Sequence, residues 1–110
     1  MFIQYDTTQL RKGLLELFVL QILSLESKYA LEVVSELNNI GLQMAEGTLY
    51  PLLTRLKNEL KIEYKWEESS SGPPRKYFII TQMGKEYLAQ GLNAYFNLSD
   101  SLKNLTNLYK

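Results

Sequence analysis

The segment of residues 46–58 constrains the fold most, because its two sides differ in chemistry. Read as a helix at about 100° per residue, it gathers four leucines in one sector, namely Leu49, Leu52, Leu53 and Leu56. The opposite sector carries small, hydroxyl, amide, aromatic and guanidinium side chains, those of Gly47, Tyr50, Pro51, Thr54, Arg55 and Asn58. Such groups hydrogen-bond to phosphates and base edges. The segment therefore predicts a helix that buries its leucines and offers its other side to DNA. For this helix taken alone, the alternative is that its polar side is an ordinary solvent-exposed face without a role in binding.

Pro51 restricts where this helix begins, because proline lacks an N–H and fits only near a helix start. We therefore predict the start at residues 46–48, with Thr48 as a candidate to cap the first turn through its hydroxyl. The free N–H groups of such an end, together with Gly47, suit a phosphate.

Two further helices are expected before this one. Between residues 10 and 25 apolar side chains recur at helical spacing, at Leu10, Leu14, Leu17, Phe18, Ile22 and Leu25. This stripe serves either the core or a subunit interface. Ser27 is the predicted cap of a second helix, and residues 38–41 stop it with Asn and Gly. The short connection to residue 46 makes the second and third helices a helix-turn-helix candidate.

A β-hairpin is expected after the third helix. Apolar and charged residues alternate over residues 62–67, which predicts a strand, and residues 75–80 read as the returning strand. Residues 69–74, Ser-Ser-Ser-Gly-Pro-Pro, are expected to form an irregular tip. Arg75 and Lys76 behind such a tip suit a wing that lies along a DNA backbone. The alternative is a solvated loop, which the acidic residues nearby favour.

The last segment predicts a long helix capped by Thr81, with apolar side chains that repeat every seven residues. One row holds Leu88, Tyr95, Leu102 and Tyr109, and the other holds Gly91, Leu98 and Leu105. Gly91 either permits a close approach of another backbone or leaves a gap. Because such a seam must be covered, we expect a second copy of the chain to cover it in a two-fold dimer.

The inventory of side chains limits the chemistry. The chain contains no cysteine and no histidine, which argues against an enzyme, a metal site and a cofactor. The charges of its twelve basic and twelve acidic residues cancel, so we do not expect a protein that coats DNA regardless of sequence. Residues 45–85 nevertheless hold a mild basic excess. Apolar runs are too short for a membrane span and the start is not a leader, so we expect a cytoplasmic protein without a membrane partner.

These elements together resemble the PadR family of bacterial transcriptional regulators. The resemblance covers roughly residues 10–90 and is carried by residues 46–51, 55–56 and 72–78, together with Thr81, Gly84 and the opening of the first helix at residues 13–16. It implies a mainly α fold with a small β-hairpin (α+β), a winged helix-turn-helix. Residues 1–81 would form the DNA-binding domain and residues 82–110 the dimerisation helix. It further implies a homodimer that represses transcription at a palindromic operator on double-stranded DNA.

The resemblance also implies roles for particular residues. Those expected at DNA are Tyr29, Gly47, Thr48, Tyr50 and Arg55 on the helices, joined by Thr54 from the polar sector, with Arg75 and Lys76 on the wing. Those expected at the dimer interface, on the first and last helices, are Leu14, Phe18, Leu88, Leu92, Tyr95, Leu98, Leu102 and Leu105.

The single C-terminal helix resembles a shorter subgroup, some members of which bind flat aromatic drugs between the subunits. A small aromatic ligand at Tyr95 and Phe96 is therefore one expectation, and ordinary dimer core is the other. The family's Gly after the third helix is Leu60 here, so either a strained positive φ or a rebuilt connection is expected. A winged-helix module that binds protein in place of DNA remains the alternative function.

Overall fold

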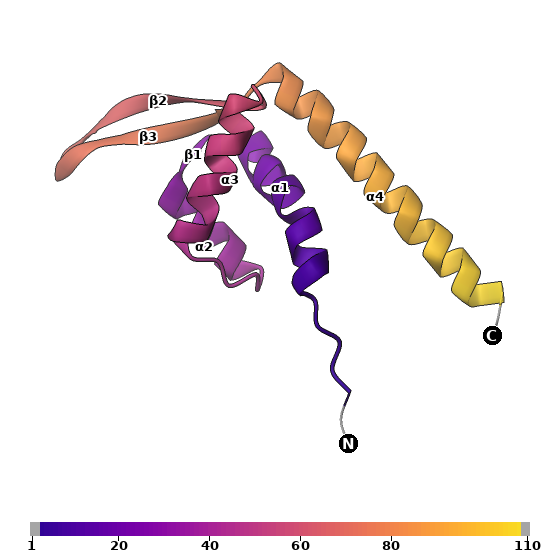
Figure 1. The fold of residues 1–110 in the computed structure, drawn as a ribbon. Helices are drawn as coiled ribbons and strands as arrows, with labels where there is room; N and C mark the ends of the chain where they lie inside the picture. The colour runs from indigo at the N-terminus through magenta and orange to yellow at the C-terminus, as the bar shows by residue number, and fades with distance from the viewer. Residues whose placement is uncertain (1–2, 109–110) are drawn as a thin grey trace.

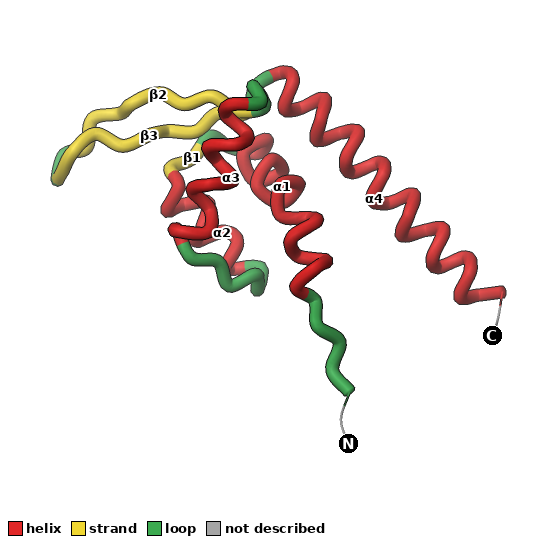
Figure 2. Tube along the Cα trace, viewed as in Figure 1, coloured by secondary structure: helices red, strands yellow, loops and turns green. Residues whose placement is uncertain are grey.

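The computed structural model describes residues 3–108 and contains, within them, four helices and a small sheet (Figures 1 and 2). In chain order the elements are α1 (Thr8–Leu25), β1 (Lys28–Tyr29), α2 (Ala30–Asn39), α3 (Glu46–Asn58), β2 (Ile62–Ser69), β3 (Gly72–Ile80) and α4 (Gln82–Leu108). This confirms the predicted fold class: a mainly helical winged helix-turn-helix with a β-hairpin and a long C-terminal helix.

The core forms where α1, α2 and α3 meet the base of the sheet. The leucine side of α3 is buried as predicted, with Leu49, Leu53 and Leu56 fully enclosed and Leu52 partly so. The other buried side chains are Val19, Leu20 and Leu23 of α1, Ala30, Val33 and Leu37 of α2, Ile62, Phe78 and Ile80 of the sheet, and Leu88 of α4. Burial on one side leaves the polar side of α3 open to solvent.

The turn between α2 and α3 follows the predicted stop signal. Gly41 has a φ of 89°, which only glycine adopts easily, and its N–H donates to the Asn38 carbonyl at 3.0 Å. The Asn38 side chain also accepts a hydrogen bond from the Met44 N–H at 2.6 Å. This compact turn (green between α2 and α3 in Figure 2) sets α3 across α2.

Two of the predicted helix caps are wrong. Ser27 does not cap α2, because residues 28–29 pair with β3 as a short strand and the helix begins only at Ala30. There the Glu32 carboxylate accepts the Tyr29 N–H at 2.9 Å. Thr48 does not cap α3 either. The helix begins at Glu46, inside the predicted range, and the Thr48 N–H itself donates to the Ala45 carbonyl at 3.1 Å.

The sheet has the strand order β1–β3–β2, with both pairs antiparallel. The hairpin is longer and more regular than predicted, since β2 reaches Ser69 and β3 starts at Gly72. Its register passes from Glu67 opposite Arg75 to Ser69 opposite Gly72 through a bulge, which leaves the two prolines without a direct partner. Proline has no N–H for the ladder, and the irregularity predicted for residues 69–74 is confined to this bulge and the turn.

Thr81 joins the hairpin to α4 and is the predicted cap. Its hydroxyl accepts the Gly84 N–H at 3.0 Å and donates to the Leu60 carbonyl at 2.6 Å. Leu60 has a φ of 64°, so of our two expectations for this connection the strained one is correct. The Thr81 hydroxyl therefore holds the start of α4 on a tight turn after α3.

The first half of α4 packs on α1, and its second half projects from the body as an arm (Figure 1). A Cβ on Gly91 would lie 2.5 Å from Leu17 Cδ2, so the Leu17 side chain of the same chain fills the space beside Gly91. The alternative of a gap is wrong, and the close neighbour is a side chain and not another backbone. Tyr109, expected in the seam, lies outside the described residues. Within residues 3–108, no helix has the length and apolarity that a bilayer span requires.

Candidate nucleic-acid interface

The open side of α3 lies beside the hairpin, and the two elements enclose a shallow hollow. Tyr50, Thr54, Lys57 and Asn58 of α3 line one wall, and Tyr64, Lys76 and Phe78 of the hairpin line the other. The hollow has a volume of about 150 Å³. Hydroxyls, an amide and two ammonium groups face it, so it offers hydrogen-bond donors to a phosphate chain.

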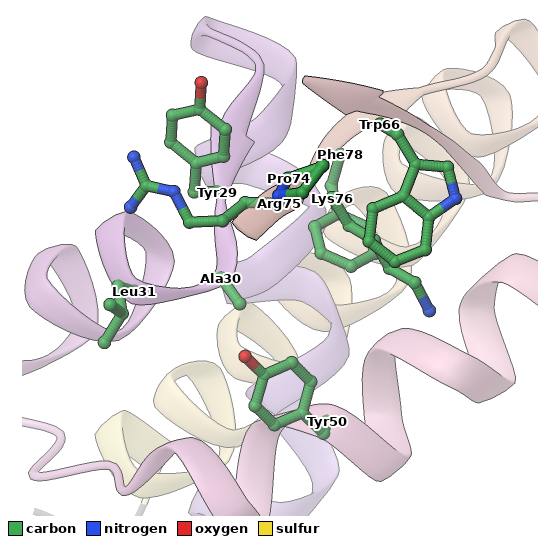
Figure 3. A pocket seen from close by; sticks show the side chains of 9 residues that line it. All are labelled: Tyr29, Ala30, Leu31, Tyr50, Trp66, Pro74, Arg75, Lys76 and Phe78. Carbon is green, nitrogen blue, oxygen red and sulfur yellow. The ribbon is translucent and has the colours of Figure 1, made fainter. Parts of the chain in front are cut away.

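A second hollow of about 300 Å³ lies between the hairpin, the start of α2 and the first turns of α3. Figure 3 shows the rings of Tyr29, Tyr50 and Trp66 around it, with Arg75 extending past Tyr29 and Lys76 beside Trp66. Its floor and remaining walls come from Ala30, Leu31, Pro74 and Phe78. Because Tyr50 and Lys76 line both hollows, the two form one continuous surface.

Aromatic rings hold the cations of the hairpin in place. The Arg75 guanidinium lies 4.3 Å from the Tyr29 ring centroid, and Lys76 Nζ lies 4.4 Å from that of Tyr64 and 5.5 Å from that of Trp66. Among residues 3–108, no carboxylate comes within ion-pairing distance of Arg75, Lys76 or Lys57. Their positive charge is therefore oriented but not neutralised.

Two of the three tyrosines that line this surface, Tyr29 and Tyr50, remain hydrogen-bond donors at neutral pH. Burial raises the pKa of Tyr50, and the nearby Glu46 carboxylate raises it further. The hydrogen bond that Tyr29 Oη donates to Glu67 at 2.7 Å raises the pKa of Tyr29. Both phenols thus stay protonated well above neutral pH.

Arg55 and Thr48 lie on the opposite edge of the open side of α3, toward α1. Arg55 is half exposed; its Nη2 lies 3.0 Å from a Glu16 oxygen and its Nη1 lies 3.2 Å from Glu59. Thr48 lines a hollow with Arg11 and Lys12 of α1. Thr54 lines the smaller hollow beside the hairpin, and Gly47 is exposed. The structure therefore groups most predicted DNA residues beside the wing and sets Arg55 and Thr48 apart from them.

Comparisons with known proteins agree with this geometry. The Transcriptional regulator PadR-like family matches residues 19–90. The chain belongs to the PadR-like family. A PadR-like transcriptional regulator from Bacillus cereus strain ATCC 14579 is 39% identical, with a TM-score of 0.81 over 90% of this chain and 97% of that one. A PadR family transcriptional regulator from Eggerthella lenta DSM 2243 is 32% identical, with a TM-score of 0.83 over 89% of this chain and 86% of that one.

A third relative comes from Lysinibacillus sphaericus. This uncharacterized protein is 33% identical over 82 residues, which are 72% of this chain and 75% of the relative. PadR-like proteins are transcriptional regulators, so this chain is a regulator of transcription and not an enzyme. Within residues 3–108, no group of three or more His, Cys, Asp or Glu side chains is arranged to hold a metal ion.

Three residues that line the candidate interface of this PadR-like protein were not predicted from the sequence. Lys57, Tyr64 and Trp66 line its hollows, although none was expected at DNA. Periodicity gave a partial signal for them. Lys57 follows Tyr50 by two helical turns and so lies on the same side of the helix, and Tyr64 and Trp66 share one face of a strand. The sequence did not indicate that this face would turn toward α3.

The predicted dimerisation residues of the regulator fall into three groups. Leu88 is 6% exposed in the core of the single chain, so it has little surface left for a partner. Leu14, Phe18 and Leu92 are half buried between α1 and α4. Tyr95, Leu98, Leu102 and Leu105 are exposed along the arm. Only the last group forms an open apolar row.

Proposed function

We propose that this regulator binds a palindromic operator on double-stranded DNA as a homodimer and represses transcription there. Each α3 would enter a major groove with Gly47, Thr48, Tyr50, Thr54 and Arg55, while Tyr29, Arg75 and Lys76 contact the neighbouring backbone. The observation that carries this proposal is the continuous surface between α3 and the hairpin, where Lys57, Arg75 and Lys76 have no ion-paired carboxylate among the residues that the structure describes. The sugar-phosphate backbone that borders the major groove would lie along these hollows.

Arg55 can take part although two carboxylates bind it. A guanidinium has five N–H donors, and the contacts to Glu16 and Glu59 engage one side of Nη1 and Nη2. The remaining donors would be available to a guanine edge or a phosphate. Such a contact would draw Arg55 partly away from Glu16 on α1. Binding of Arg55 to DNA would therefore compete with its ion pair to Glu16.

The homodimer is inferred from the arm. Leucines exposed along α4 would be covered by the same row of a second chain, and the two α3 helices would then reach major grooves about 34 Å apart on one face of DNA. The division into a DNA-binding domain of residues 1–81 and a dimerisation helix of residues 82–110 is part of this proposal. DNA binding would place the protein in the cytoplasm.

Release by a small aromatic ligand is proposed at the hollow between α1 and α4. This hollow of about 250 Å³ is lined by Leu14, Leu17, Phe18, Gln21, Leu92, Tyr95 and Phe96. The Tyr95 and Phe96 rings meet edge to face, 5.4 Å apart. Its lining is almost entirely apolar, which favours a flat hydrophobic guest. A ligand here would separate α1 from α4 and would disturb the dimer.

Arg55→Ala should weaken binding to the operator, because it removes a planar donor from the open side of α3. We expect a loss of roughly 1–3 kcal/mol, with relaxed preference at one base pair if Arg55 contacts guanine. Thr48→Val, which keeps the shape of the side chain, should remove a single phosphate contact and cost less. Fluorescence anisotropy at one fixed salt concentration, on duplexes selected by the wild-type protein, measures both. Unchanged affinity in both variants would remove α3 from this role.

The same titration separates DNA binding from the alternative, a module that binds protein. Each phosphate contact releases a counterion, so log affinity for DNA should fall with log salt by about 0.9 per contact. A partner held by apolar contacts would respond little to salt. Weak, salt-independent binding to DNA would favour the protein-binding alternative.

A further inference from the structure

The Glu16 carboxylate joins three helices. It lies on α1 with its side chain only 19% exposed, and each of its oxygens has a partner on another element. Oε2 accepts a hydrogen bond from Arg55 Nη2 of α3 at 3.0 Å. Oε1 accepts a short hydrogen bond from the Tyr87 hydroxyl of α4. One half-buried group thus connects the proposed recognition helix with the proposed dimerisation helix.

Two further residues close these contacts into a ring. Lys61, just after α3, places its Nζ 3.5 Å from the Tyr87 ring centroid and 2.8 Å from Glu59 Oε1. Glu59 in turn binds Arg55 Nη1 at 3.2 Å. The cycle therefore runs from Glu16 through Tyr87, Lys61, Glu59 and Arg55 back to Glu16. Every charge in it therefore has an opposite neighbour.

The protonation states of Glu16 and Tyr87 favour the hydrogen bond between them. Burial alone would raise the pKa of Glu16, but the hydrogen bonds from Tyr87 and Arg55 and the charges of Arg55 and Lys61 outweigh it, so that pKa lies below its ordinary value. The hydrogen bond to Glu16 raises the pKa of Tyr87, with burial adding to it. At neutral pH the carboxylate is ionised and the phenol is protonated, as the hydrogen bond requires.

The ring matters because α3 and α4 share little direct packing. The first half of α4 packs on α1, whereas α3 packs on α2 and β2. The angle between α3 and α4 therefore depends on the packing of α4 against α1 and the base of the sheet, on the turn at Leu60 and on this ring. An α4 of 27 residues is about 40 Å long, so a rotation of roughly 10° at its base displaces its far end by about 7 Å, or two base pairs of DNA.

We propose that Glu16 is a positioning residue, which fixes the angle between α3 and α4 and thereby the separation of the two α3 helices in the dimer. The inference rests on the proposed function for its consequence on DNA, but the angle itself is a property of one chain. Without the carboxylate, Tyr87 and Arg55 lose their common partner, and only apolar packing and the turn at Leu60 hold α4 against α3, so the range of angles between the two helices widens. The operator spacing that the protein accepts then widens.

Distance measurements within one chain test this directly. The chain has no cysteine, so Asn58→Cys on α3 and Asn104→Cys on α4, both exposed, give two spin labels at known places. Pulsed electron paramagnetic resonance, with labelled chains diluted in unlabelled protein, reports the distance between the labels within one chain. We expect a single narrow distribution in the otherwise unchanged protein. Glu16→Gln should broaden or shift it by several Å.

Two more variants keep the result interpretable. Tyr87→Phe removes only the hydroxyl and should broaden the distribution in the same way, so it carries the test if Glu16→Gln folds poorly. Glu86→Gln is the matched control, because it removes an exposed carboxylate next to Tyr87 on α4 that takes no part in the ring. Distributions of Glu16→Gln and Tyr87→Phe that coincide with the unsubstituted one would overturn the proposal, whether or not the protein binds DNA.

A DNA experiment then tests the consequence. Duplexes carrying half-sites selected by the wild-type protein are remade with one or two base pairs added or removed between them. The wild-type protein should prefer its own spacing by about tenfold or more. Glu16→Gln should lose most of this preference while keeping its affinity for a single half-site, which a merely unfolded variant would not do. An unchanged spacing preference would contradict the role of Glu16, and an absence of all DNA binding would instead contradict the proposed function.

Discussion

Replacing Leu98 and Leu102 by glutamate should convert the proposed dimer into a monomer and lower its affinity for the operator by about a hundredfold or more. Both leucines point outward on the arm, 73% and 63% exposed in the single chain. Burying one leucine contributes about 2 kcal/mol, and two-fold symmetry doubles each substitution. Losing four such contacts and placing like charges in the seam would outweigh the remaining interface.

The lower affinity for the operator is expected because both half-sites lie on one DNA molecule. A dimer binds its second half-site at high effective concentration, and a monomer loses this advantage of about 10²–10⁴. Sedimentation velocity measures the oligomeric state, and anisotropy at fixed salt measures the affinity. Asn104→Glu, exposed on the arm outside the predicted seam, is the matched control and should remain dimeric. A double-leucine variant that stays dimeric would show that the arm is not the interface.

Gly84→Ala should lower the free energy of unfolding by about 3 kcal/mol, the largest effect on stability that we expect from one methyl group. Gly84 lies in the first turn of α4, where a Cβ would overlap the Lys61 carbonyl oxygen and lie 2.8 Å from Ile80 Cγ1. That carbonyl cannot easily move, because it accepts the Thr81 N–H at 3.1 Å in the strained connection. The start of α4 would be pushed away from the sheet.

Gly13→Ala is the control variant for Gly84→Ala. Gly13 also lies inside a helix, but a Cβ there meets nothing within 4 Å. Alanine should therefore stabilise α1 by up to about 1 kcal/mol through helix propensity alone. Urea unfolding followed by circular dichroism measures both variants. Equal destabilisation by the two substitutions would mean that the close packing at Gly84 is not what requires glycine there.

Local signals in the sequence predicted most of the fold. The leucine side of α3, the stop at Gly41, the cap at Thr81 and the alternation in β2 each depend on residues a few positions apart. Short-range periodicity and capping encode such features. The error at Ser27 arose where pairing to the distant strand β3 overrode local preference, and the error at the hairpin tip arose because pairing between the adjacent strands β2 and β3 extends almost to the turn.

The candidate interface was less predictable, because it is assembled across the chain. The sequence suggested that Arg55 faces outward but not that Glu16, 39 residues away, would bind it. Gly91 was recognised as unusual, yet only the packing of α4 on α1 identifies Leu17 as its neighbour. Trp66 and Lys57 became candidates only when the hairpin was placed beside α3. Long-range contacts of this kind leave no local periodicity to detect.

In the proposed function, two open sides of α3, carried by one dimer, bind the same DNA molecule. Hydroxyl-radical footprinting of the unmodified protein on a duplex that it selects tests this most directly. We predict two protected stretches on one face of the DNA, related by two-fold symmetry and centred about 10 base pairs apart. A single protected stretch, or none at low salt, would contradict the account.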